Sequence, residues 1–239
     1  MGKLKGLEYY ISKGMGQAMV DYKMLAAGDK IAVAVSGGKD SLTLLHFLLL
    51  RQAFVPLKYS VIAIHIDFGY PKSIAARLEK YFKKLKVDYR IIKSDILKKT
   101  PKNKINCFWC SWNRRKELFI AADKLGCTKI ALGHHLDDIV ETILMNLFFR
   151  GEFSSMVPKQ ELFSGKITLI RPLAYIEEDL IRDFAKVIKF KIDPCVCPQA
   201  LVSNRKKIGL IIKQLKKICP DIKKNIFRSL KRVKKDYLL

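Results

Sequence analysis

Short runs of small and β-branched residues alternate along this chain with segments of helical length. The runs that predict buried strands are residues 30–36, 59–69, 88–96 and 128–135. Between them, apolar residues recur every three to four positions, which indicates amphipathic helices. Helices placed in this way act as crossovers between parallel strands. We therefore predict an α/β fold built on a doubly wound parallel sheet.

The pattern loosens after Pro158. Residues 166–173 predict an edge strand, and residues 177–190 predict a further helix. Apolar residues recur at helical spacing over residues 204–218, between many lysines. The chain therefore ends in a basic helical region, which we place at residues 201–239.

The chain is also strongly basic as a whole. Its 46 Lys and Arg residues exceed its 22 Asp and Glu residues, for a net charge of +24 over 239 residues. Residues 201–239 contain 13 of these basic residues and 2 aspartates. Such an excess favours a nucleic-acid partner, because each basic side chain near a phosphate releases a counterion. Lysine-rich genomes, heat adaptation and solvated helix faces are the alternative explanations.

The hydropathy of the chain predicts no membrane-spanning helix. The longest apolar run, residues 42–50, is far shorter than the roughly 20 residues that a spanning helix needs. The first residues lack the pattern of a signal peptide. We therefore expect a cytoplasmic protein, in which the six cysteines are metal ligands, redox groups or core residues before they are disulfides.

The sequence SGGKDS, Ser36–Ser41, follows the first predicted strand. Ligands of open parallel sheets bind beyond the carboxyl ends of the strands. Gly37 and Gly38 allow positive φ and close backbone approach, while successive N–H groups and the helix start attract an anion. The turn therefore predicts a phosphate site, with Lys39 adding charge. An ordinary strand–helix turn with Ser and Asp caps is the alternative.

Polar residues also follow the second and fourth predicted strands. HIDFG, His65–Gly69, presents Asp67 to a ribose or a metal, or is a plain polar strand end. In GHHLDD, Gly133–Asp138, the two aspartates could bind Mg²⁺ or transfer a proton. They could equally be acids that the helix macrodipole favours at a helix start. His134 and His135 are packing residues as readily as ligands.

Two cysteine pairs suggest a metal or redox site. CFWC, residues 107–110, lies at the start of a helix, where thiolates are favoured. CVC, residues 195–197, is the second pair. Together they could form a four-cysteine zinc site, a redox dithiol or an iron–sulfur site, or be buried thiols. Cys127 and Cys219 are isolated on apolar patterns and are predicted core thiols.

Several motifs in order give a narrower resemblance. SGGKDS, CFWCSWNRR, ALGHHLDD, ETILMNLFF, IRPLAY and a late cysteine after proline resemble the tRNA 2-thiocytidine synthetase family, the tRNA-cytidine 2-sulfurtransferases. They also resemble the related tRNA 2-thiouridine synthetases, within the PP-loop ATP pyrophosphatases of adenine nucleotide alpha hydrolase-like fold. The matches run from Ser36 to Arg205. The lack of outlying CxxC pairs favours the cytidine branch, whereas the CxC spacing of the late cysteines departs from it.

This resemblance implies ATP-dependent 2-thiolation of a tRNA base, with cytidine 32 of the anticodon loop as the first choice. The base would be O-adenylated and then attacked by sulfide delivered from a [4Fe-4S] cluster. ATP and Mg²⁺ would be required, and a sulfur donor such as sulfide or a cysteine desulfurase. The sequence leaves open whether the protein forms a homodimer. The alternatives are a tRNA 2-thiouridine synthetase, a zinc-containing ATP-dependent tRNA-modifying ligase, and a non-catalytic nucleic-acid-binding protein with a four-cysteine zinc site.

The resemblance also implies roles for individual residues. It makes residues 1–200 the PP-loop domain with the iron–sulfur site and residues 201–239 a basic extension. Cys107, Cys110 and Cys197, in preference to Cys195, would hold the cluster. Arg114 would balance negative charge on the cluster, a phosphate or the adenylate. The implied catalytic residues are Asp137, Asp138, Arg114 and Cys197, and those for ATP are Ser36, Gly37, Gly38, Lys39, Asp40, Ser41, His65, Asp67 and Gly133.

Overall fold

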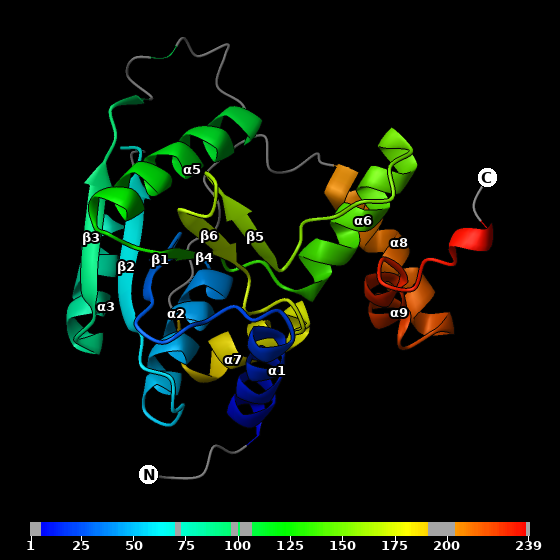
Figure 1. The fold of residues 1–239 in the computed structure, drawn as a ribbon, viewed down its shortest axis with the longest axis horizontal. Helices are drawn as coiled ribbons and strands as arrows, with labels where there is room; N and C mark the ends of the chain where they lie inside the picture. Colours follow the sequence, from blue (N-terminus) through cyan, green and yellow to red (C-terminus); the bar gives the residue numbers. More distant parts are fainter. Residues whose placement is uncertain (1–5, 70–72, 97–99, 101–106, 191–203, 238–239) are drawn as a thin grey trace.

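The structure is a computed structural model that describes residues 6–69, 73–96, 100, 107–190 and 204–237. Figure 1 shows the arrangement of its helices and strands. In chain order they are α1 (Leu7–Asp21), β1 (Lys30–Ala34), α2 (Lys39–Gln52), β2 (Ser60–Asp67), α3 (Ala75–Leu85), β3 (Asp88–Lys93), α5 (Cys107–Lys124), β4 (Lys129–Ala131), α6 (Leu136–Arg150), β5 (Lys159–Leu162), β6 (Ile167–Ile170), α7 (Glu178–Val187), α8 (Asn204–Ile218), α9 (Ile222–Ser229) and the short 3₁₀ helix η3 (Lys235–Tyr237).

The strands form one six-stranded sheet in the order β3-β2-β1-β4-β6-β5. Neighbouring strands from β3 to β6 run parallel, and β5 runs antiparallel to β6. The predicted parallel sheet is confirmed. The edge position predicted for residues 166–173 is wrong, because β6 lies inside the sheet and β5 forms the edge. All four residues of β6 are buried, whereas β5 exposes its two central polar residues.

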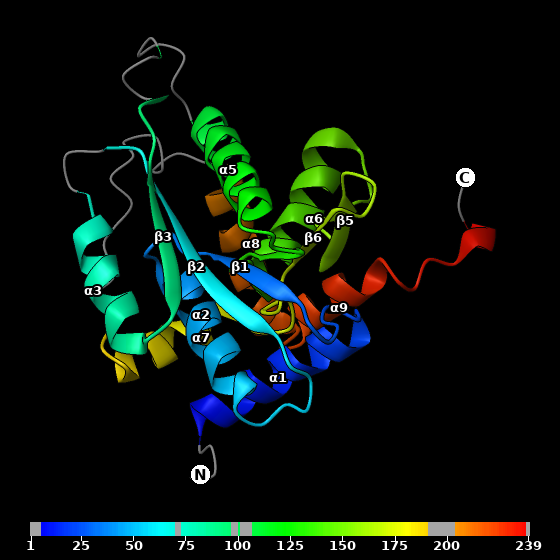
Figure 2. The same cartoon turned by 60° about the vertical axis from the view of Figure 1, so that its left-hand side comes forward.

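Helices cover both faces of the sheet, as the doubly wound prediction requires. On one face, α1, α2, α3 and α7 enclose a core that includes Phe47, Phe82 and Phe184. On the other face, α5 packs through Leu118 and Ala122 onto β2, β4 and β6. Figure 2 shows the sheet between α5 and the opposite helices. The central strands are therefore buried on both sides, which explains their continuous apolar sequences.

The remaining helices, α6, α8 and α9, pack against one another beside the sheet (Figure 1). Val140 of α6 and Ile208 and Ile212 of α8 form the centre of this contact. Helices α8 and α9 thus pack against α6 through part of their apolar residues. The apolar residues of α8 that stay exposed are Leu210, Ile211, Leu215 and Ile218. Within the described part of the chain, no helix is long and apolar enough to cross a membrane.

Candidate nucleotide-binding and catalytic site

The direction in which strands are added to the sheet reverses between β1 and β4. In open α/β sheets the ligand binds at the carboxyl ends of the strands at such a point. Ser36–Ser41 follows β1, and Gly133 follows β4. A Cβ atom added to Gly133 would lie only 3.0 Å from the backbone nitrogen of Ser41. The two motifs are therefore in direct backbone contact, and a side chain at Gly133 would crowd the backbone of the SGGKDS turn.

The SGGKDS turn is held together by its serines. The Ser41 hydroxyl donates to the Gly38 carbonyl at 2.9 Å, and the Ser36 N–H donates to Ser41 Oγ at 3.2 Å. Gly37 has φ +86°, a conformation that favours glycine. Gly38 has φ −76° and ψ 158°, which any residue adopts. The predicted need for positive φ is confirmed at Gly37 and wrong at Gly38.

Lys39 is held by two acids at this turn. Its Nζ lies 2.9 Å from Glu178 Oε1 of α7 and 3.0 Å from Asp40 Oδ1. Burial lowers the pKa of Lys39, but the bonds to Glu178 and Asp40 outweigh this and raise it. The ammonium group therefore stays charged beside the turn, where it can meet a phosphate. Glu178 was not among the predicted site residues.

His135 and Asp138 form the start of α6. The His135 N–H donates to Asp138 Oδ2 at 3.1 Å, and the Asp138 N–H donates to His135 Nδ1 at 3.4 Å. This reciprocal pair is a capping box with histidine in the place of serine. His135 is buried, and its Nε2 lies 3.7 Å from Asp40 Oδ1. The histidine therefore connects the start of α6 to the SGGKDS turn.

The two predicted catalytic aspartates have protein partners on every carboxylate oxygen. Asp137 Oδ2 accepts the Glu178 N–H at 2.8 Å, and Asp137 Oδ1 pairs with Lys223 of α9. Asp138 Oδ1 pairs with Arg205 at 2.8 Å, and its Oδ2 caps α6. In the described residues, no group of three or more His, Cys, Asp or Glu side chains is placed to hold a metal ion.

Arg171 is a second functional candidate that the sequence did not single out. It is buried directly after β6, and its Nε donates to His134 Nδ1 at 3.2 Å. Burial, with a smaller contribution from the charge of neighbouring Arg171, lowers the pKa of His134 to about 4. Burial and nearby Arg115 lower the pKa of Arg171 to about 10. His134 is therefore neutral at pH 7 and accepts a hydrogen bond from the charged Arg171. The sequence signal that could have pointed to Arg171 is an arginine within the otherwise apolar IRPLAY segment.

The end of β2 gathers three of the predicted residues. His65 is buried, with Nδ1 2.8 Å from the Val35 carbonyl, and burial lowers its pKa. Asp67 Oδ1 accepts the Gly69 N–H at 2.9 Å. The guanidinium of Arg114 lies 5.2 Å from the centre of the Phe68 ring. The structure therefore brings Arg114, from α5, to the strand end where His65 and Asp67 lie.

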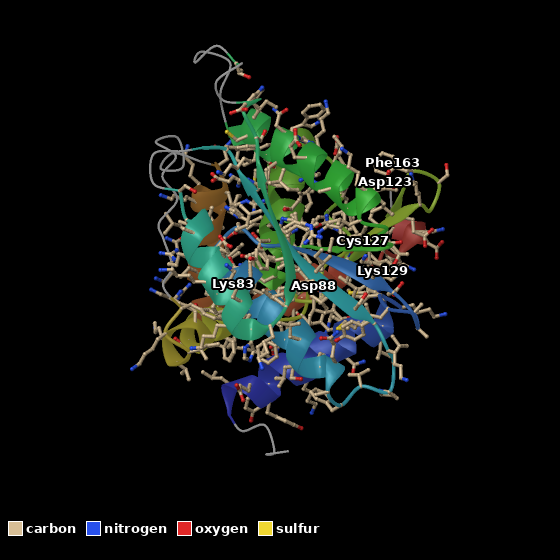
Figure 3. All side chains as sticks on the ribbon, turned by 90° about the vertical axis from the view of Figure 1, so that its left-hand side faces the viewer. Lys83, Asp88, Asp123, Cys127, Lys129 and Phe163 are labelled. Atoms are coloured by element: carbon tan, nitrogen blue, oxygen red, sulfur yellow. The ribbon has the colours of Figure 1, made fainter. Side chains whose placement is uncertain are left out.

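The predicted cluster ligands lie largely outside the described part of the chain. The backbone of α5 begins at Cys107, and Cys110 is half-buried one turn later. Cys195 and Cys197 fall outside the described residues. Cys127 is a core thiol as predicted: it is buried just before Lys129, at the amino end of β4 (Figure 3). The same prediction is wrong for Cys219, which is only half-buried.

Comparisons with known proteins place this site in a family. A family model for the PP-loop domain matches residues 11–205. A tRNA-cytidine(32) 2-sulfurtransferase of Geobacter sulfurreducens is 38% identical over 96% of this chain and 91% of its own length. That of Geobacter metallireducens is 40% identical with the same coverage. The chain belongs to the tRNA-cytidine(32) 2-sulfurtransferase family. The resemblance stated from its motifs is thereby confirmed, including the preference for the cytidine branch.

A solved structure agrees with this membership. The U34-tRNA thiolase NcsA from Methanococcus maripaludis, with its [4Fe-4S] cluster, matches with a TM-score of 0.77. The match covers 95% of this chain and 79% of NcsA at 25% sequence identity. This chain therefore shares its α/β fold with a thiolase whose structure contains a [4Fe-4S] cluster.

Proposed function

We propose that this sulfurtransferase catalyses ATP-dependent 2-thiolation of cytidine 32 in tRNA. The observation that carries the proposal is the backbone contact between the SGGKDS turn and the segment that begins at Gly133, at the strand reversal of a chain in this family. The C2 oxygen of the base attacks the α-phosphate of ATP, and pyrophosphate leaves. Sulfur from a donor then attacks C2, and AMP leaves with the original oxygen. Two easier steps replace one difficult substitution.

The phosphates of ATP are proposed to bind Ser36–Ser41. Gly37 gives the turn the positive φ found in anion-binding loops, and Lys39 supplies a positive charge beside it. Asp40 is the acid of the turn that would accompany Mg²⁺, since Mg²⁺ bound to phosphates needs only one or two carboxylates. Buried His65 and Asp67 would frame the adenosine at the end of β2.

Asp137 and Asp138 are proposed to act by holding the helices around the site in place. Their oxygens bind Lys223, Glu178, Arg205 and the start of α6, so the pair fixes the helices around the site. Arg114, beside the end of β2, is placed to balance negative charge on the adenylate. The proposal therefore keeps all three residues in the site and assigns metal binding to neither aspartate.

Cys107, Cys110 and Cys197 are proposed to hold a [4Fe-4S] cluster. The half-buried Cys110 at the first turn of α5 fits such a role, because a helix start favours thiolates. When bound by three cysteines, the cluster would offer one open iron to sulfur. Sulfide or a cysteine desulfurase as donor, a homodimer, a cytoplasmic location and a division into residues 1–200 and 201–239 remain predictions from the sequence.

Nucleoside mass spectrometry tests this function. The protein is purified without oxygen and incubated with unmodified tRNA, ATP, Mg²⁺ and sulfide. We expect 2-thiocytidine at position 32 only when ATP and the cluster are both present, together with one pyrophosphate per sulfur incorporated. Thiolation of uridine would assign the protein to the uridine branch. A colourless zinc protein that leaves the tRNA unmodified would overturn the proposal.

A further inference from the structure

Lys223 is a buried lysine on a helix whose other residues are half-buried or exposed. It is the one residue of α9 that is buried, with 8% of its surface accessible. Its Nζ pairs with Asp137 and lies 3.2 Å from Glu177 Oε2. Burial lowers the pKa of Lys223, but the bonds to Asp137 and Glu177 outweigh this and raise it. Burying a charged group costs free energy unless the group is paired, so the buried ammonium of Lys223 depends on its ion pairs with Asp137 and Glu177.

The contacts of Lys223 continue to the phosphate-binding turn. Asp137, which Lys223 holds through Oδ1, accepts the backbone N–H of Glu178 at 2.8 Å through Oδ2. The carboxylate of Glu178 in turn lies 2.9 Å from Lys39 Nζ. Lys39 is the charged residue of the SGGKDS turn. An uninterrupted series of bonds therefore joins the C-terminal helix α9 to that turn.

The neighbouring acids make this series sensitive to charge. Glu177 and Asp137 share Lys223, and Lys216 of α8 adds a second cation 2.8 Å from Glu177 Oε2. Without Lys223, Lys216 alone would balance the two negative charges of Glu177 and Asp137, close to where the phosphates of ATP would lie. Removal of one partner of a buried ion pair leaves the other charge uncompensated. Both effects act against the binding of ATP.

We propose that Lys223 is a positioning residue for ATP: it fixes Asp137 against the start of α7 and so holds Glu178 and Lys39 at the phosphate-binding turn. The PP-loop family model ends at residue 205, so this role belongs to a part of the chain beyond the nucleotide-binding domain. The inference rests on the proposed function, because it assumes that ATP binds at SGGKDS.

The test compares Lys223→Met with Lys223→Arg and with Lys224→Met. Lys224 is the matched control, because it is the next residue of α9 but is exposed and pairs only locally with Asp221 at 2.9 Å. ATP affinity is measured by calorimetry without tRNA, and tRNA affinity, cluster absorbance and melting temperature are measured alongside. We expect Lys223→Met to weaken ATP binding about tenfold, and Lys223→Arg to restore most of it. Lys224→Met should bind ATP like the wild type.

A double variant separates positioning from general destabilisation. Lys223→Met with Asp137→Asn leaves no uncompensated charge, so it should fold even where Lys223→Met alone does not. If Lys223 acts through Asp137, the double variant binds ATP as weakly as Asp137→Asn alone. Wild-type ATP affinity in Lys223→Met or in the double variant overturns this inference and leaves the proposed function standing. Failure of the wild-type protein itself to bind ATP overturns both.

Discussion

The two glycines of the SGGKDS turn differ in what they require. Gly37 has positive φ, and a Cβ there would lie 2.2 Å from Ile74 Cδ1. Gly38 has an ordinary backbone conformation, and a Cβ would meet only Ser36 Oγ, at 3.5 Å. Gly37→Ala therefore strains the fold, whereas Gly38→Val changes mainly the space that a phosphate would fill.

We expect Gly38→Val to keep the melting temperature within about 3 °C of the wild type, since an unstrained surface substitution changes stability by little. ATP-dependent pyrophosphate release should fall at least a hundredfold, because the branched side chain blocks the turn. Thermal unfolding and a pyrophosphate assay check both. Full activity in Gly38→Val would show that the phosphates bind elsewhere.

Individual cysteines give a second prediction at this scale. Cys110→Ser and Cys197→Ser should each lose the brown colour and 2-thiocytidine formation, while Cys195→Ser should keep both. Cys219→Ser is the control, because Cys219 lies after α8, where the Asn225 amide nitrogen is 3.6 Å from its sulfur. Iron content and visible absorption of anaerobic protein measure the effect. Loss of iron in Cys195→Ser alone would move the third ligand to that residue.

The contacts and burial of a single residue could be predicted from the sequence only where neighbouring residues in the chain determine them. The SGGKDS turn, the capping of α6 by Asp138 and the burial of Cys127 all follow from local pattern, and all are present. The partners of Asp137 could not be predicted, because Glu178 and Lys223 reach it only after the chain has folded. Lysines in a basic helix look alike in sequence whether they face water or an acid.

Elements were predictable where periodicity was strong. The helix expected at residues 204–218 is α8 with the same bounds, and the strand expected at residues 30–36 contains β1. The edge strand β5 was missed, because KQEL has no apolar alternation. Helix α1 was also missed, because its apolar and polar residues are not clearly divided between two faces. It buries Ser12 and Gly16 together with Ile11 and Met15.

The contact between α6 and α8 carries a pH-dependent element. Glu141 of α6 lies 3.7 Å from Arg205, and a Cβ on Gly209 of α8 would lie 3.4 Å from Glu141 Oε1. The pKa of Glu141 is raised from 4.5 to about 7: burial raises it most, the Arg205 charge opposes this, and the Asp138 charge adds to it. Between these values the folded protein binds more protons than the unfolded chain. Its stability therefore falls as pH rises from about 4.5 to 7.

Glu141→Gln should remove this loss, because glutamine does not titrate. We expect the variant to melt about 2–5 °C above the wild type at pH 8 and to approach it at pH 5. Melting temperatures over this pH range measure the difference. Glu161→Gln, an exposed acid on β5, is the control and should follow the wild type at every pH. A constant offset between Glu141→Gln and the wild type would show that Glu141 does not titrate in this range.

At the scale of the whole molecule, the basic C-terminal region has two sides. Its inward lysines, Lys216 and Lys223, pair with acids close to the SGGKDS turn. Lys207, Lys213 and Lys217 of α8 are exposed. The sequence predicted the excess of charge in this region but not this division, because the division depends on which side of α8 and α9 meets α6 and α7. The exposed lysines are therefore the ones available to an anionic partner.

These exposed lysines give the last prediction. Replacing Lys207, Lys213 and Lys217 together by Gln should weaken tRNA binding and reduce the slope of log affinity against log salt by about two to three, since each phosphate contact contributes roughly 0.7–0.9.

Lys58, Lys80 and Lys84 form a matched control set: they are also exposed, but lie before β2 and on α3, whereas α8 packs against α6. Filter binding at several salt concentrations, with ATP affinity measured in parallel, compares the two triple variants. ATP affinity should stay unchanged in both, because none of these lysines touches the Lys223–Asp137–Glu178 series. If both sets change the slope equally, tRNA responds to net charge, and α8 is not its docking surface.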